Sequence, residues 1–227
     1  SSFFDGFNFE TFDDPTHGYV DYVNSTVAFD NNYAEIRSDS DSDQIYIGVD
    51  HTNYVGDNDR GRKSIRLSSK KSYNGNNVVI IDVEHMPSTH GDLADGCSIW
   101  PAFWMVGENW PYGGEIDIIE YVNVDSSVTT TLHTDNGCDQ SEEDEGSFTG
   151  TWGVGSEGNN ADNCSIWAYD QWTNEGCGIA EKNVPVGAAF NAKSSGGVFV
   201  LEWDVDTHIR AFFFARGAIP SDIAERK

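Results

Sequence analysis

The sequence predicts an all-β fold, a jelly roll or sandwich of two antiparallel sheets, from three observations. Short runs rich in Val, Ile, Tyr and Phe alternate with turns of Gly, Asn, Asp and Ser, which is the pattern of short strands. Helical periodicity is scarce along the chain. The length of 227 residues suits a single all-β domain with one sizeable core.

Ten strands are expected, and their spacing fits a sandwich or jelly roll. They are Gly18–Val23, Tyr33–Arg37, Gln44–Val49, Ser64–Ser68, Asn77–His85, Ser98–Met105, Glu115–Val122, Val128–His133, Gly197–Asp204 and His208–Phe214. The fifth and sixth are apolar on both faces, as central strands are. The segment 134–196 shows little periodicity and is expected to be a long loop region, which usually has a functional or covalent reason to be ordered.

Four cysteines, Cys97, Cys138, Cys164 and Cys177, lack the Cys-x-x-Cys spacing of zinc or redox sites. Disulfides are therefore expected, and three of the four cysteines crowd into the predicted loop region, which a covalent link would help to order. Disulfides indicate a secreted, extracellular protein. No apolar run approaches the roughly 18 residues that a membrane helix needs, so no membrane partner is expected.

The net charge of the chain limits the classes of partner that we expect it to bind. Thirteen Lys and Arg residues against 38 Asp and Glu give a formal net charge of −25, which repels phosphate backbones but not neutral sugars. We expect no nucleic acid partner, no required cofactor and a monomer. The acidic clusters Asp39–Asp43, Asp57–Asp59 and Glu142–Glu145 are interpreted as solvated loops, with a structural calcium site as the weaker alternative.

The segment Gly113-Gly-Glu-Ile-Asp-Ile-Ile-Glu120 carries three acids on one predicted strand. Side chains alternate along a strand, so Glu115 and Asp117 share a face while Glu120 falls on the face of Ile116. One β-bulge between Asp117 and Glu120 shifts this phase and brings all three carboxylates to the same side. The sequence therefore predicts a bulge there.

Such a cluster suits glycoside hydrolysis. That chemistry needs one ionised and one protonated carboxyl group, and a pair about 5–5.5 Å apart gives retention through a covalent intermediate. We interpret Glu115 as nucleophile, Glu120 as general acid/base and Asp117 as the residue that tunes the pair, although geometry alone leaves the order open. A solvated strand face or a three-carboxylate cation site is the alternative.

Three tryptophans lie within twenty residues of Glu120 on its N-terminal side. Trp104 and Trp110 flank the turn that leads into the acid strand, where stacking on sugar rings is favoured over core packing; for Trp100 the two interpretations are balanced. His133 ends the next strand and is either a hydrogen-bond donor to substrate or nucleophile, or a structural histidine.

The motifs Trp100-Pro-Ala-Phe-Trp104 and Trp110-Pro-Tyr-Gly-Gly-Glu-Ile-Asp-Ile-Ile-Glu120 resemble glycoside hydrolase family 16, especially its fungal-type laminarinases, the endo-1,3(4)-β-glucanases. The similarity extends over nearly the whole chain, from Asp14-Pro-Thr-His-Gly18 to Phe212-Phe-Phe-Ala-Arg216. It implies a β-jelly-roll sandwich with an open substrate cleft and retaining endo-hydrolysis of β-1,3 or mixed β-1,3/1,4 glucan.

The resemblance also implies roles for individual residues. It gives sugar contacts to Trp104 and Trp110, places His133 beside the catalytic centre, and makes Arg66 a donor toward the non-reducing side, with Arg62 as a competing match. It further implies that residues 1–227 form one catalytic domain that lacks the first short strand and the last strands of such enzymes.

Two other functions stay open. A non-catalytic glucan-binding lectin on the same fold would keep Trp104 and Trp110 but has no need of three acids. A related enzyme could act on another polysaccharide, such as agarose, carrageenan or xyloglucan, although the negative charge disfavours sulfated polymers.

Overall fold

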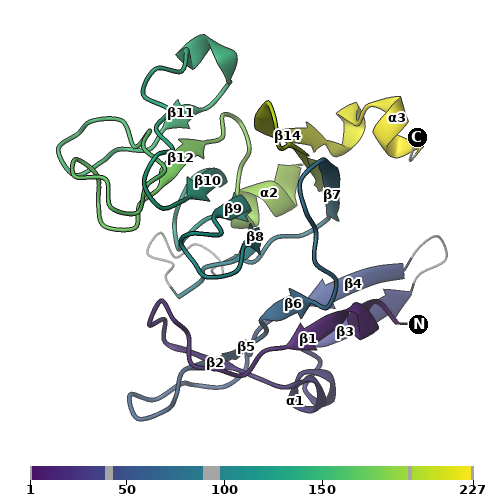
Figure 1. Ribbon diagram of the computed structural model, residues 1–227. Coiled ribbons are helices and arrows are strands. Elements are labelled where there is room, and N and C mark those ends of the chain that lie inside the picture. Colours follow the sequence, from purple (N-terminus) through teal and green to yellow (C-terminus); the bar gives the residue numbers. More distant parts are fainter. Residues whose placement is uncertain (1, 39–42, 89–97, 194–195, 226–227) are drawn as a thin grey trace. The chain divides into compact units, whose positions relative to one another are not determined.

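The computed structural model describes residues 2–38, 43–88, 98–193 and 196–225 (Figure 1). Strands predominate among these residues and the helices are short, so the all-β prediction is confirmed. The chain divides into two compact units, Ser1–Asn74 and Gly75–Lys227. In the part of the chain described, no helix is long and apolar enough to cross a membrane.

The first unit is built from three two-stranded pairs, one short α-helix and the 3₁₀ helix η1 (Phe3–Gly6). Strand β1 (Phe7–Phe9) pairs with β6 (Leu67–Ser69), β2 (Val20–Tyr22) with β5 (Arg62–Ser64), and β3 (Ala34–Ser38) with β4 (Asp43–Ile47). The β2–β5 pair is parallel and the other two are antiparallel. Helix α1 (Ser25–Asp30) begins at Asn24, whose side chain accepts a hydrogen bond from the Val27 amide, as an N-cap residue does.

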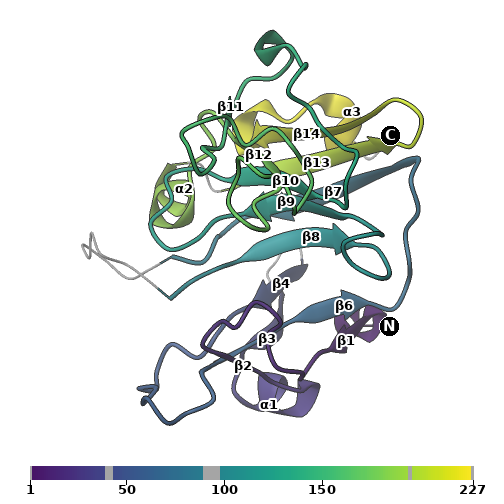
Figure 2. The ribbon, with the colours of Figure 1, turned by 60° about the vertical axis from the view of Figure 1, so that its left-hand side comes forward.

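The second unit contains two sheets, which Figure 2 shows. The larger has the strand order β11-β12-β10-β9-β8, and the smaller has the order β14-β13-β7. Their bounds are β7 Asn77–Val83, β8 Ala102–Val106, β9 Glu115–Glu120, β10 Thr129–His133, β11 Thr151–Trp152, β12 Cys177–Ala180, β13 Gly197–Asp204 and β14 His208–Ala215.

One apolar core joins these two sheets. Ile116, Ile118 and Ile119 of β9 belong to the same buried cluster as Phe199 and Leu201 of β13. Alternate residues of the neighbouring strands pack against that cluster, as expected when one face of each sheet is buried. The sandwich therefore leaves the opposite face of β9 for polar residues.

The segment 134–196 is not the long loop that the sequence predicts. It contains β11 and β12, which extend the larger sheet beyond β10, and helix α2 (Gly187–Lys193), which buries Phe190 completely. Strand β1 was also not expected, and β8 begins only at Ala102, after Pro101, because proline has no amide to donate to a sheet.

Cys164 and Cys177 form a disulfide between residues 13 positions apart. The prediction of a disulfide in this part of the chain is thus confirmed. Cys138 makes no disulfide with any described residue, and Cys97 lies outside the described residues.

Candidate active site

Strand β9 contains the expected bulge. On one side, Phe103 and Trp104 are adjacent in β8 but pair with Ile119 and Asp117, so β9 has one residue more than its partner. The β10 side shows the same shift between Thr129 and Thr131. The extra residue lies between Asp117 and Glu120, and both Ile118 and Ile119 are buried in the core.

The bulge places the three carboxylates on one face of the sheet. Residues directly opposite one another in an antiparallel pair share a face, and the pairing gives Glu115 with Val106, Asp117 with Trp104, and Glu120 with Ala102. We call this the acid face. The alternate residues of β8, Phe103 and Met105, pack on the core instead, so the two faces of β8 are cleanly separated.

Strand β10 completes the acid face on the other side. His133 lies opposite Glu115, and Thr131 lies opposite Asp117. His133 is 8% exposed and Asp117 is 2% exposed, and His133 Nε2 is 3.3 Å from Asp117 Oδ2. In this structure His133 therefore contacts Asp117, the central acid of the three.

Each glutamate is contacted by a tryptophan. Trp100 Nε1 donates to Glu120 Oε1 at 2.5 Å, although the Trp100 ring is 54% exposed. The Trp110 side chain hydrogen-bonds the Glu115 carboxylate and is 41% exposed. These rings hold the two carboxylates through their N–H groups and leave much of their apolar surface open to solvent.

Tight turns set the position of Trp110 relative to Glu115. The Gly107 amide donates to the Gly114 carbonyl, and the Gly114 amide donates to the Pro111 carbonyl. A Cβ atom on Gly113 would lie 2.3 Å from the Glu108 carbonyl oxygen, closer than any side chain tolerates. Glycine is required there because the two ends of the hairpin approach backbone to backbone.

The pKa values of both glutamates are raised. For Glu115, burial and then the charge of Asp117 raise the pKa to about 7, against smaller lowering effects of His133 and Trp110. For Glu120, burial and then Asp117 raise the pKa, and the hydrogen bond from Trp100 opposes this. At neutral pH Glu115 is therefore partly protonated, whereas an exposed carboxylate would be ionised.

The pKa of His133 is raised as well. Burial alone would lower it, but the hydrogen bond and charge of Asp117 and the charges of both glutamates outweigh burial. A protonated His133 beside Asp117 offsets part of the negative charge on the acid face.

Replacing Asp117 with asparagine tests this electrostatic account. The change removes a negative charge that raises the pKa of both glutamates, so those pKa values should fall. The alkaline limb of the profile of kcat/KM against pH is then expected to move toward acid pH. The matched change Asp206→Asn, in the exposed turn between β13 and β14, should leave the limb in place; an equal shift in both variants would contradict the account.

Three of these residues could also hold a cation. Glu115, Asp117 and His133 each offer one ligand atom, and these atoms lie within 4.8 Å of one another. Because two carboxylates and a neutral imidazole suit several divalent ions, the donor set by itself does not select one metal.

Sequence reasoning missed two residues that shape this face. Thr131 is 5% exposed beside Asp117, and its place in the alternation of β10 could have identified it. Gly176 precedes β12 with a φ of +70°, and a Cβ atom there would lie 2.7 Å from His133 Nδ1. The contact between Gly176 and His133 follows from the pairing of β12 with β10, which could not be predicted from the sequence.

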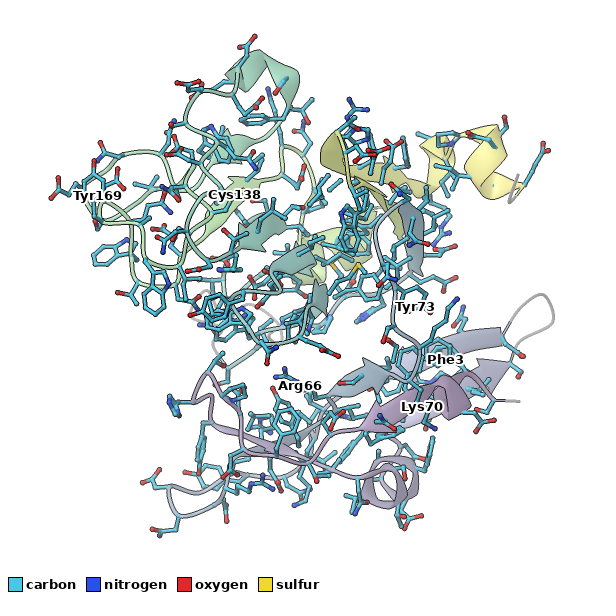
Figure 3. The ribbon with its side chains drawn as sticks, in the orientation of Figure 1. Phe3, Arg66, Lys70, Tyr73, Cys138 and Tyr169 are labelled. Atoms are coloured by element: carbon cyan, nitrogen blue, oxygen red, sulfur yellow. A yellow bond between two sulfur atoms is a disulfide. The ribbon has the colours of Figure 1, made fainter. Side chains whose placement is uncertain are left out.

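Arg66 and Arg62 belong to the first unit. Arg66 is labelled in Figure 3. Its Nη1 atom lies 3.8 Å from Asp14 Oδ1, and its guanidinium lies over the Phe12 ring at 5.1 Å. Arg62 Nη1 donates to the Asp50 carbonyl at 2.8 Å. The acid face described above consists of residues of the second unit alone, and the role of Arg66 stays a prediction.

Comparisons with known proteins give the family. The family model of the XgeA-like, catalytic GH16 domain matches residues 7–227. A relative from Aspergillus fumigatus named "Probable endo-1,3(4)-beta-glucanase" is 38% identical over 223 residues, which are 98% of this chain and 30% of the relative. This chain thus spans less than a third of that relative's length.

Two solved structures are similar over 98% of this chain and 67% of theirs. One, described as an elongating GH family 16 beta-1,3-glucosyltransferase, is 39% identical with a TM-score of 0.79. The other, Laminarinase 16A from Phanerochaete chrysosporium, is 34% identical with a TM-score of 0.80 and holds 6-O-glucosyl-laminaritriose in donor and acceptor sites. The match to the family model, the shared fold and the bulged acid strand agree, and the chain belongs to glycoside hydrolase family 16.

Proposed function

We propose that this chain is the catalytic domain of a retaining endo-β-glucanase that cleaves β-1,3 or mixed β-1,3/1,4 glucan. The observation that carries this proposal is the grouping of Glu115, Asp117 and Glu120 on one face of a bulged strand. The printed names of the relatives, endo-1,3(4)-beta-glucanase and laminarinase, support the choice of polymer.

The proposed reaction has two displacements. The Glu115 carboxylate attacks the anomeric carbon, the glycosidic C–O bond breaks, and Glu120 gives its proton to the departing oxygen. Glu120 then takes a proton from water, which attacks the anomeric carbon of the glycosyl ester and releases Glu115. Two inversions restore the β configuration.

The protonation of the pair is compatible with these roles. Glu115 and Glu120 lie on one face beside the charge of Asp117, which raises the pKa of both, and the form of the site that carries one proton can place it on either group. Burial and Asp117 raise the pKa of both groups, and the reaction requires the proton on Glu120. Both arrangements carry one proton. The dependence of activity on pH therefore reports the total protonation of Glu115 and Glu120, whichever of the two holds the proton.

Asp117 and His133 complete the proposed centre as positioning residues. Asp117 lies between the two glutamates on the strand, and His133 is fixed against it at 3.3 Å. The charge of Asp117 raises the pKa of Glu120, which keeps the acid protonated at a higher pH. Trp104, opposite Asp117 in β8, supplies an aromatic side chain on the same face for contact with a sugar ring.

A panel of polymers tests the proposed function. The protein should release reducing ends from laminarin and lichenan and none from agarose. We propose that no cofactor takes part, because two carboxylates suffice for this chemistry, so activity should survive dialysis against EDTA. Binding of glucan without turnover would instead support a lectin, and turnover of agarose or xyloglucan alone would reassign the polymer.

Transfer to a second sugar is a second candidate function. A solved relative at 39% identity is described as a glucosyltransferase, and a sugar hydroxyl can replace water in the second displacement. Products longer than the oligosaccharide supplied would support transfer.

We further propose that the protein is secreted and monomeric. The disulfide Cys164–Cys177 supports secretion, because such bonds persist in oxidising compartments.

A further inference from the structure

The disulfide Cys164–Cys177 closes a loop that we call the aromatic loop, residues 165–176. Three large aromatic side chains of this loop face solvent: Trp167 is 60% exposed, Tyr169 is 94% exposed and Trp172 is 62% exposed. Figure 3 shows Tyr169 at the outer margin of the loop, directed away from the sheet. Single exposed aromatic residues are ordinary, but three within six residues form an exposed apolar patch, and such patches commonly mark binding sites.

The aromatic loop is held by its own polar contacts. Gln171 is 6% exposed, and its amide accepts from the Asn163 amide N–H and donates to the Gly176 carbonyl at 2.7 Å. The Trp172 amide donates to Glu175 Oε2 at 2.7 Å. Ile166, at 3% exposure, supplies the buried apolar contact. These contacts hold the loop without the rings of Tyr169 and Trp172, so a defined backbone maintains the exposure of those rings.

The aromatic loop adjoins the acid face at His133. Ser165 forms a β-bridge with Thr134, the residue after His133. Trp167 Nε1 donates to Asp135 Oδ1 at 3.2 Å. At the other end of the loop, the space where a Gly176 side chain would stand is filled by the His133 ring. Both ends of the loop are therefore held at the end of β10, the strand that borders Glu115, or at the two residues that follow it.

The chemistry of the aromatic loop fits a neutral polyhydroxylated ligand. Residues 164–177 contain no Lys or Arg but include Asp170 and Glu175, which excludes attraction to phosphate or anionic lipid. Aromatic faces supply apolar contact for the C–H faces of sugar rings, and acidic and amide groups accept or donate hydrogen bonds to hydroxyl groups.

We propose that the aromatic loop is a second sugar-binding platform, on which Trp167, Tyr169 and Trp172 contact glucose units of a β-glucan chain beyond those held at the acid face. The proposal rests on the proposed function, because it assigns the same polymer to both surfaces. The occupant is a continuous glucan strand, since the loop adjoins the acid face through His133 and Asp135. The platform would favour long chains over short oligosaccharides.

Kinetics on long and short substrates test the platform. The variant Tyr169→Ala/Trp172→Ala removes two rings and leaves the Trp167–Asp135 hydrogen bond intact. Loss of two aromatic contacts is expected to raise KM for laminarin roughly tenfold. For an aryl β-laminaribioside, which is too short to extend past the acid face, kcat/KM should change less than twofold. Trp172→Phe, which keeps a ring, should recover part of the affinity.

Controls separate the platform from other causes. Phe212→Ala removes a side chain that is 41% exposed on β14, outside the larger sheet, and should leave both substrates unaffected. Unchanged KM for laminarin in the double variant would overturn the proposal, and so would an equal loss on both substrates, which indicates a structural role. If the wild-type protein hydrolyses neither substrate, the proposed function itself fails, and binding of laminarin to Glu115→Gln by tryptophan fluorescence still tests the platform.

Discussion

Replacing Glu115 with alanine is expected to lower the hydrolysis of laminarin by at least about 10⁴-fold, because the nucleophile of the covalent route is lost. Sodium azide should restore turnover of an aryl glucoside substrate by attacking the anomeric carbon from the vacated side. The product is then an α-glycosyl azide, since only one inversion takes place. A β-glycosyl azide from this variant would place the nucleophile elsewhere.

The stability of Glu115→Gln provides an independent check on that carboxyl group. Its pKa is about 7 in the folded chain, raised by burial and by Asp117 from a reference of 4.5. Between these values the unfolded chain has released a proton that the folded chain still holds, so stability falls as pH rises through this range. The melting temperature of the variant should therefore be higher than that of the wild type at pH 8 and nearly equal to it at pH 4. An unchanged melting temperature at pH 8 would contradict the burial of this charge.

Replacing Glu120 with alanine should affect substrates according to their leaving groups. Hydrolysis of laminarin is expected to fall by about 10³-fold, within the range for loss of a general acid. An aryl glycoside with a dinitrophenolate leaving group needs no proton in the first step, so formation of the covalent intermediate should be nearly unaffected. Azide should then yield a β-glycosyl azide, the opposite of the Glu115 variant.

The variant Asp125→Asn is the control for a local disturbance of the structure near Glu120. Asp125 accepts a hydrogen bond from the Val122 amide, two residues beyond Glu120. Its replacement should leave the dependence on leaving group unchanged. Equal loss on laminarin and on the activated substrate in Glu120→Ala would remove Glu120 from the role of acid.

The bulge in β9 was predictable from the sequence because side chains alternate along a regular strand, and only an extra residue brings all three acids to one face. Ile116, Ile118 and Ile119 are apolar and Glu115, Asp117 and Glu120 are acidic, and a regular strand would bury a carboxylate in the core. The structure resolves this conflict with one extra residue between Asp117 and Glu120.

Other parts of the site could not be read from the sequence. Strand β12, Cys177–Ala180, is four residues long in a Gly-rich segment without alternation, and it is defined by pairing with β10. The contact of Gly176 with His133 depends on that pairing. The hydrogen bond from Trp100 to Glu120 links residues 20 positions apart, and local patterns carry no information about such contacts.

The anomeric configuration of the first product, followed by proton NMR during hydrolysis of laminarin or lichenan, tests the central claim most directly. Glu115 and Glu120 on one face, acting as nucleophile and acid/base, predict that the β-anomer appears first and that the α-anomer follows only by mutarotation. Initial release of the α-anomer would show a single displacement by water and contradict the account.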